Sequence, residues 1–131
     1  MKIEVLVEGD PDIKPLTKIF HYKKSDELIF LESTKLIKNR LENRMRLNVD
    51  ETLWFFVAYI ITSLNEDKPI NEITKHIREL LSPNQVLIGV PESLRRLTFT
   101  ISLNENQCEL LSILTPISIN QYFFHELEKT A

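Results

Sequence analysis

Residues 97–103 read Leu-Thr-Phe-Thr-Ile-Ser-Leu, and this stretch decides which class of fold the chain adopts. Apolar residues alternate strictly with threonine and serine, which is the period of a half-buried strand. Residues 108–115 are expected to return as a second strand, and the polar residues 104–107 between the two are typical of a turn. The pattern predicts an antiparallel β-hairpin near the end of the chain.

The sequence before this hairpin has a helical period. Ser25-Asp26-Glu27 offers a side-chain cap and acidic residues where a helix dipole favours them, so it predicts a helix start. Asn48 and Glu51 have the spacing of a capping box at the start of a second helix. Residues 53–64 are apolar on almost every side, which indicates a buried helix. The apolar stripe of the first helix is expected to comprise Leu28, Ile29, Leu36, Ile37 and Leu41.

A third helix is predicted after Pro69, which suits a first helical turn. Ser82-Pro83-Asn84 is expected to end it, and residues 85–89 are expected to form one short helical turn. The apolar face of this third helix is expected to comprise Ile70, Ile73, Ile77, Leu80 and Leu81.

The N-terminal residues 2–8 also alternate, with Leu6 as the exception, and predict a strand. We expect it to add to the C-terminal hairpin, because two strands alone form a marginal sheet. Residues 13–24 are interpreted as an irregular connection.

Together, the elements predict an α+β fold with three main helices packed on a C-terminal antiparallel hairpin. The expected organisation is an N-terminal strand and connection over 1–24, a main domain over 25–117, and a tail over 118–131 that forms a short helix.

Composition narrows the function. The chain has 131 residues, the size of one domain, and a formal net charge of −3, which argues against a nucleic-acid-binding protein. Its longest apolar run, Leu53 to Ile61, is nine residues, too short for the roughly 20 that span a bilayer. Glu4 and Glu8 interrupt the apolar start, so no signal peptide is expected. We expect a cytoplasmic protein.

The sequence assigns no catalytic, cofactor-binding or metal-binding residue. His21, His76 and His125 are scattered and lack metal-site spacing, so we interpret them as surface residues, although folding could still bring all three together. The single cysteine, Cys108, excludes an intramolecular disulfide and is interpreted as a small core residue.

Two groups of basic residues stand out, the pair Arg95-Arg96 and a set towards the end of the first helix. They either form a solvated face that complements the helix dipole or contact an anionic patch on a partner protein. The second set comprises Lys38, Arg40, Arg44 and Arg46.

Two sequence blocks carry a family resemblance. Leu47, Asn48 and Glu51 form a Leu-Asn-x-x-Glu helix start. After Leu81 and a short polar stretch comes Gln-Val-x-x-Gly-Val-Pro-Glu, formed by Gln85, Val86, Gly89, Val90, Pro91 and Glu92. With the alternating strand and the closing Pro116-Ile117, these blocks resemble the urease gamma subunit over roughly residues 26–117. The family usually has proline where Asp50 stands and histidine where Leu114 stands.

The resemblance implies a non-catalytic structural subunit of a nickel-dependent urease. In that family the nickel ions and the catalytic groups belong to the alpha subunit, so no cofactor is expected in this chain. The implied partners are urease alpha and beta subunits, in a trimeric assembly.

Self-association is also expected because the aromatic residues of the second helix cannot all point inward. They are Trp54, Phe55, Phe56 and Tyr59. The alternative function is a stand-alone oligomeric interaction module that kept this fold. An independent small-molecule enzyme is disfavoured, because no nucleophile–base pair or metal set can be named.

Overall fold

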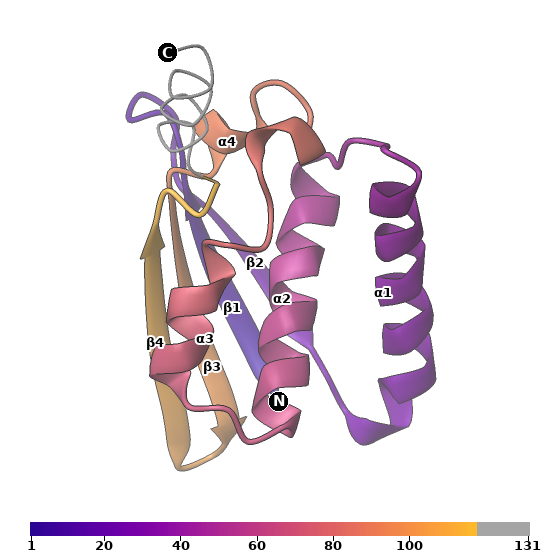
Figure 1. Cartoon of the computed structure of the whole chain (residues 1–131). Helices are drawn as coiled ribbons and strands as arrows, with labels where there is room; N and C mark the ends of the chain where they lie inside the picture. The colour runs from indigo at the N-terminus through magenta and orange to yellow at the C-terminus, as the bar shows by residue number, and fades with distance from the viewer. Residues whose placement is uncertain (118–131) are drawn as a thin grey trace.

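The computed structural model describes residues 1–117, so the tail helix expected within 118–131 lies outside the described part of the chain. Two strands come first, four helices follow, and two more strands end the described part (Figure 1). Single 3₁₀ turns lie at Lys24–Asp26 and Pro83–Gln85. The strands and helices are β1 Lys2–Glu8, β2 Leu16–His21, α1 Glu27–Glu42, α2 Val49–Asn65, α3 Ile70–Ile77, α4 Val90–Ser93, β3 Arg96–Asn104 and β4 Gln107–Leu114.

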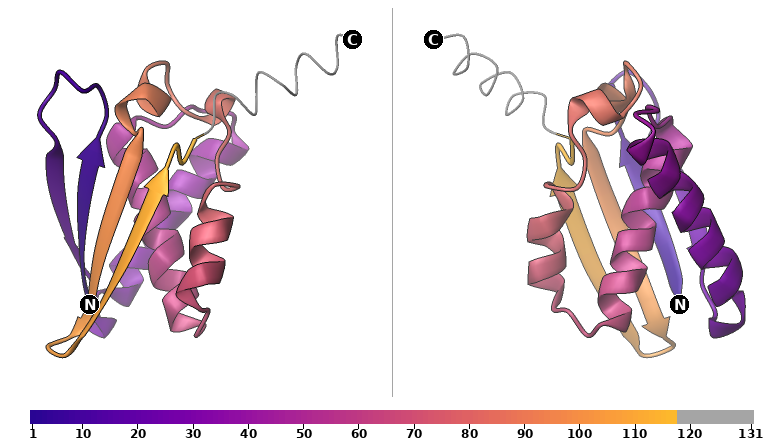
Figure 2. Two further views of the ribbon diagram at one scale, coloured as in Figure 1. Left: turned by 90° about the vertical axis from the view of Figure 1, so that its left-hand side faces the viewer. Right: turned by 45° about the vertical axis from the view of Figure 1, so that its right-hand side comes forward.

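The molecule has two layers. One is a four-stranded antiparallel sheet in the order β2-β1-β3-β4. Helices α1, α2 and α3 lie on one side of this sheet (Figure 2). Burial alternates along β1 and β3, as expected for strands that are covered on one face only. The α+β class predicted from the sequence is confirmed.

The N-terminal strand joins the hairpin as predicted. β1 pairs with β3, and the pairs Ile3–Ile101, Val5–Phe99 and Val7–Leu97 lie on the face that the helices cover. All six side chains are buried, so the two strands share one apolar surface. β1 is therefore an inner strand of the sheet.

The prediction of an irregular connection over residues 13–24 was wrong, because β2 occupies residues 16–21 of this segment. β2 pairs with the free edge of β1 and completes an N-terminal hairpin. Its lysine obscured the strand pattern: Lys18 pairs with Val5 in register and so projects towards the helical layer. A charge is tolerated there because β2 is the edge strand, and inward-pointing charges on edge strands also discourage unwanted pairing.

Helix α1 begins as expected but differs in its cap and its buried face. A 3₁₀ turn leads into it, and the Asp26 side chain makes no capping hydrogen bond. Phe30 and Ile37 are its buried residues. The predicted stripe was wrong for Leu28, Ile29 and Leu36, which are all exposed. The physical reason is that α1 packs against α2 along a narrow face, and its other sides remain uncovered.

Helix α2 forms the centre of the core, as its composition predicts. The side chains fully enclosed along it are Leu53, Phe56, Val57, Ile60 and Ile61. The sheet, α1 and α3 surround it (Figures 1 and 2). Trp54, Phe55 and Tyr59 are only half-buried, in agreement with the expectation that its aromatic residues cannot all point inward.

The region after α3 differs from the prediction in detail. α3 ends at Ile77, before the expected stop at Ser82-Pro83-Asn84. The single helical turn lies at residues 90–93 instead of 85–89 and forms α4. Gly89 precedes it with φ of 93°, a left-handed conformation that glycine adopts without a steric penalty.

Gly9 allows the end of β1 to approach α4 closely. A Cβ atom at this position would lie 2.7 Å from the backbone oxygen of Ser93 and 3.0 Å from its Cα. Because these are backbone atoms, a side-chain rotation could not relieve the contact. Gly9 therefore fixes how closely the N-terminal hairpin lies against the segment that leads into β3.

We expect Ile3→Ala to destabilise the chain by about 2–5 kcal/mol, because it deletes buried side-chain atoms at the centre of the sheet. Ile19→Ala is the matched control, since Ile19 is 51% exposed on the outer face of the same sheet. That control should change stability by no more than about 1 kcal/mol. Urea unfolding followed by circular dichroism measures both, and equal losses would contradict the inner position of β1.

We expect Gly9→Ala to lower stability by about 1–3 kcal/mol, because the added methyl group forces β1 and α4 apart. Glu8→Ala changes the neighbouring residue without crowding Ser93 and should stay within about 0.5 kcal/mol of the unmodified chain. Thermal unfolding of the two variants is the measurement. An unchanged melting temperature for Gly9→Ala would show that this approach is not tight.

Candidate functional site

The two blocks that carried the family resemblance lie side by side in the structure. Leu47 forms a parallel bridge with Val86. The Leu47 amide donates to the Gln85 carbonyl at 3.0 Å, and the Leu87 amide donates to the Leu47 carbonyl at 2.8 Å. Leu47 and Val86 are both buried. We call this pairing of residues 47–51 with residues 85–92 the motif junction.

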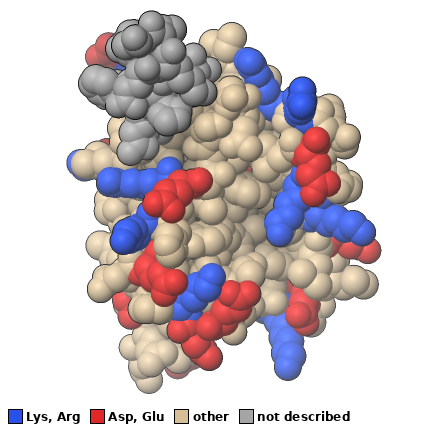
Figure 3. Space-filling view, in the orientation of Figure 1, with Lys and Arg blue, Asp and Glu red and all other residues tan. Residues whose placement is uncertain are grey.

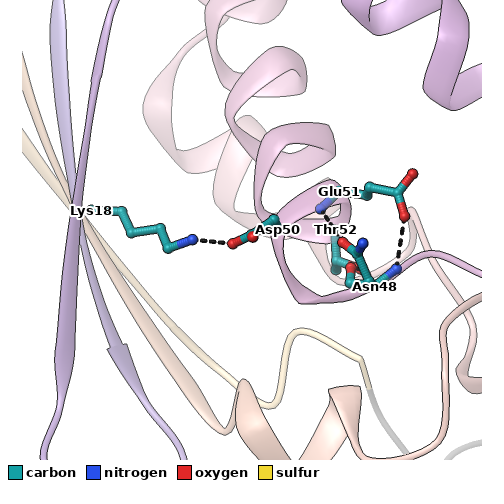
Figure 4. Close-up of polar contacts among 5 residues, drawn as sticks. All are labelled: Lys18, Asn48, Asp50, Glu51 and Thr52. Atoms are coloured by element: carbon teal, nitrogen blue, oxygen red, sulfur yellow. Dashed lines mark hydrogen bonds and ion pairs between the residues drawn. The ribbon is translucent and has the colours of Figure 1, made fainter.

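A capping box fixes each side of the motif junction. The Glu51 amide donates to Asn48 Oδ1 at 2.8 Å, and the Asn48 amide donates to Glu51 Oε1 at 3.1 Å. This confirms the predicted start of α2 (Figure 4). On the other side, the Ser82 amide donates to Gln85 Oε1 at 2.9 Å. The glutamine of the Gln-Val block therefore holds its own 3₁₀ turn and contacts Leu47 through its backbone.

Two ion pairs attach neighbouring elements to the start of α2. Lys18 of β2 pairs with Asp50, where the resembling family usually has proline (Figure 4). Arg40 of α1 lies 3.0 Å from Glu51. All four residues retain some solvent exposure, so each pair contributes little to stability but fixes which surfaces meet. The sequence pattern gave Lys18 no role, because residues 13–24 were expected to form a connection and Lys18 is in fact the third residue of β2.

An aromatic cluster joins the N-terminal hairpin to the helices. Trp54 lies 5.9 Å from Phe20 and 5.7 Å from Phe30 between ring centroids, and Tyr22 lies 5.1 Å from Phe30. The hollow of about 180 Å³ beside these rings also borders Ile29. His21, Asp26 and Ile61 complete its lining together with the packed rings. The rings hold the N-terminal hairpin, α1 and α2 together.

The outward surface of α1 is unusually apolar. Leu28 is 69% exposed, Ile29 68% and Leu36 65%. Leu31 adds to them, on a helix whose opposite face is already packed against α2. Several large exposed apolar side chains on one helix often mark protein–protein contacts.

Within residues 1–117, the histidines and the cysteine form no metal-holding cluster. His21 is exposed at the end of β2, His76 is half-buried on α3, and His125 lies outside the described residues. Within residues 1–117, no three His, Cys, Asp or Glu side chains are placed to share a metal ion. The structure therefore gives no basis for a nickel site in this part of the chain.

The prediction that Cys108 is a small core residue was wrong, because its side chain is exposed. Leu111 and Ile113 of β4 are buried, and strand residues alternate between faces. Cys108 therefore belongs to the outer face of the sheet, opposite Ser102 of β3. Reading the face from Ile113 backwards along the strand would have indicated this.

The basic residues separate into different settings. Arg40 is paired with Glu51, and Lys38 lies beside a small hollow between α1 and α2. Arg44 and Arg46 border a polar hollow below the end of α1. Arg95 and Arg96 are exposed where the chain enters β3. The four basic residues towards the end of α1 were grouped on their spacing in the sequence, but they lie in three different surroundings in the structure.

The helices described in residues 1–117 are too short or too polar to traverse a lipid bilayer.

Comparison with known proteins assigns the chain to a family. The family model for the urease gamma subunit matches residues 19–117, which include all of the motif junction. The urease subunit gamma of Halalkalibacterium halodurans is 26% identical over 92 residues, or 70% of this chain and 91% of that protein. The urease subunit gamma of Saccharopolyspora erythraea is 23% identical over 93 residues, or 71% and 92% of the two chains. Since the match extends over most of the chain, the protein belongs to the urease gamma subunit family.

Proposed function

We propose that this chain is a non-catalytic structural subunit of a nickel-dependent urease, with the chemistry on the alpha subunit. The observation that carries the proposal is the family match over residues 19–117. The match includes α1, α2, α3 and the C-terminal hairpin. The chain itself aligns with about nine-tenths of each of two relatives named as urease gamma subunits. A structural role suits a chain whose described residues form no metal-holding cluster of His, Cys, Asp or Glu side chains.

The outward face of α1 is the surface we propose for contact with the other urease chains. Leu28, Ile29, Leu31 and Leu36 form this α1 face. Burying apolar surface stabilises an association by about 25 cal/mol per Å² before the cost of lost motion. Glu32 and Lys35 lie between these residues and add charges that select the orientation of a partner.

We further propose a cytoplasmic, homo-oligomeric protein, with a trimer favoured by the family resemblance. The half-buried Trp54, Phe55 and Tyr59 give α2 additional apolar surface beyond what the described residues cover. Neither nucleic acid nor a membrane is among the proposed partners.

A second candidate function is a stand-alone interaction module that kept this fold. It is favoured by the sequence beyond the family match: β1 and half of β2 precede residue 19. The relatives align with only about seven-tenths of this chain. The additional hairpin changes the surface that any partner meets.

Co-purification separates the two candidates. We expect a tagged copy, co-expressed with the urease alpha and beta chains of its own genome, to bring both down in equal amounts. Replacing Leu28 and Leu36 of the α1 face by aspartate should abolish this, because a partner would have to bury the new charges. Quantitative gel densitometry of the complex, with light scattering for its mass, is the measurement.

Leu110→Asp is the matched control for the α1 face. Leu110 is 65% exposed on the outer face of the sheet, so the substitution adds the same charge elsewhere. The complex should survive it. If Leu110→Asp abolished the complex and the α1 variant kept it, the contact would lie on the sheet. If the unmodified chain captured neither subunit, the stand-alone module would be favoured.

The isolated chain should neither hydrolyse urea nor hold nickel stoichiometrically. The expectation follows from the absence of a ligand cluster in residues 1–117 and from the family's placement of nickel on another subunit. Ammonia release and calorimetric nickel titration test it, with the assembled urease as the positive control. One nickel ion per chain retained after chelation, or urea turnover by the pure chain, would contradict it.

A further inference from the structure

A polar hollow of about 480 Å³ lies where α1 ends and the chain turns towards α2. Lysine and arginine side chains gather over this corner of the molecule, at the upper right of the space-filling view (Figure 3). The residues that line the hollow are Leu41, Arg44, Met45, Arg46, Asn84 and Gln85. The hollow therefore combines two cations and two amides with an apolar wall.

Among residues 1–117, neither arginine of the hollow takes part in an ion pair. The ion pairs among residues 1–117 join Lys18 to Asp50, Arg40 to Glu51 and Lys68 to Glu66. No ion pair in that part of the chain includes Arg44 or Arg46, and both residues are exposed. Their guanidinium groups can therefore bind another molecule without breaking an existing contact.

Arg44 also holds an unfavourable backbone conformation. Its φ is 59°, in the left-handed region, at the point where α1 ends. Glycine is the residue that usually occupies this position after a helix, and an L-residue there costs about 1–2 kcal/mol. A side chain kept at such a position, beside a hollow, is a candidate for a binding role.

The backbone around the two arginines is held at both ends. The Met45 amide donates to the Arg40 carbonyl at 2.8 Å, and the Leu47 amide donates to the Gln85 carbonyl at 3.0 Å. The opposite wall is fixed by the Ser82–Gln85 capping box. Arg44 and Arg46 therefore extend from a fixed segment, so a ligand need not order the backbone when it binds.

We propose that this hollow, which we call the arginine corner, binds an acidic, leucine-containing segment of a partner protein. Two guanidinium groups match carboxylates with paired, charge-assisted hydrogen bonds. Asn84 can pair with the backbone of the segment, and Leu41 and Met45 supply contact for apolar side chains. A phosphate site would instead favour a glycine-rich backbone cradle, and the only glycines of the chain are Gly9 and Gly89.

This inference goes beyond the proposed function. The arginine corner is distinct from the α1 face, and it would serve either a urease subunit or a stand-alone module. Its test is binding of the full chain to a short blocked peptide of glutamate pairs separated by leucine. The control peptide carries glutamine in place of glutamate.

We expect the glutamate peptide to bind and the glutamine peptide to bind at least about tenfold more weakly, as loss of charge-assisted hydrogen bonds requires. Arg46→Gln should weaken binding of the glutamate peptide about tenfold as well. Arg44→Gly should do the same while raising the melting temperature, because glycine relieves the left-handed backbone. Isothermal titration and thermal unfolding measure these effects.

Arg78→Gln is the matched control, since it removes one exposed arginine just after α3 and outside the arginine corner. It should leave peptide binding unchanged. Equal weakening by Arg78→Gln would overturn the proposal, because binding would then follow net charge alone. So would equal affinity for the two peptides, or tighter binding of inorganic phosphate than of the glutamate peptide.

Discussion

Burial of α2 is the constraint on which the rest of the structure depends. Along this helix, Phe56, Val57 and Ile60 have no exposed surface. Burial of each side chain stabilises the fold by about 1.5–3 kcal/mol relative to leaving it in water. A helix that is apolar on nearly all sides needs cover in several directions at once. The sheet covers one side of it, and α1 and α3 flank it (Figure 1). The capping box at Asn48 then determines where this buried helix begins.

The same constraint leaves other surfaces open. Since one face of the sheet is used to cover α2, the opposite face carries Ile19, Leu110 and Cys108 towards solvent. α1 contacts α2 along a narrow face and presents Leu28 and Leu36 outward. Among residues 1–117, no third layer covers these side chains. Its uncovered apolar surface is consistent with a chain whose role is to contact others.

Sequence periodicity predicted the elements that are covered on one face or buried altogether. Residues 97–103 and 2–8 show their strand pattern because one face of each strand meets the helices. The pattern fails where cover is incomplete: β2 is an edge strand with Lys18 facing inward, and Leu28 of α1 faces outward. The positions of these two side chains depend on an ion pair and on an exposed surface, and both exist only in the folded chain. The motif junction was also beyond prediction, because backbone hydrogen bonds at Leu47 leave no periodic signal.

The N-terminal hairpin shares one sheet and one core with the segment that the family model matches. The match begins at residue 19, within β2, yet β1 pairs with β3 from Arg96 to Ser102. Without β1, the backbone groups on that edge of β3 would lose their partners, and Phe99 would lose Val5 from its side. Gly9 and the Lys18–Asp50 pair attach the hairpin at two further points, against α4 and α2. A change in the hairpin can therefore reach the motif junction through direct contacts, since Lys18 pairs with Asp50 within it.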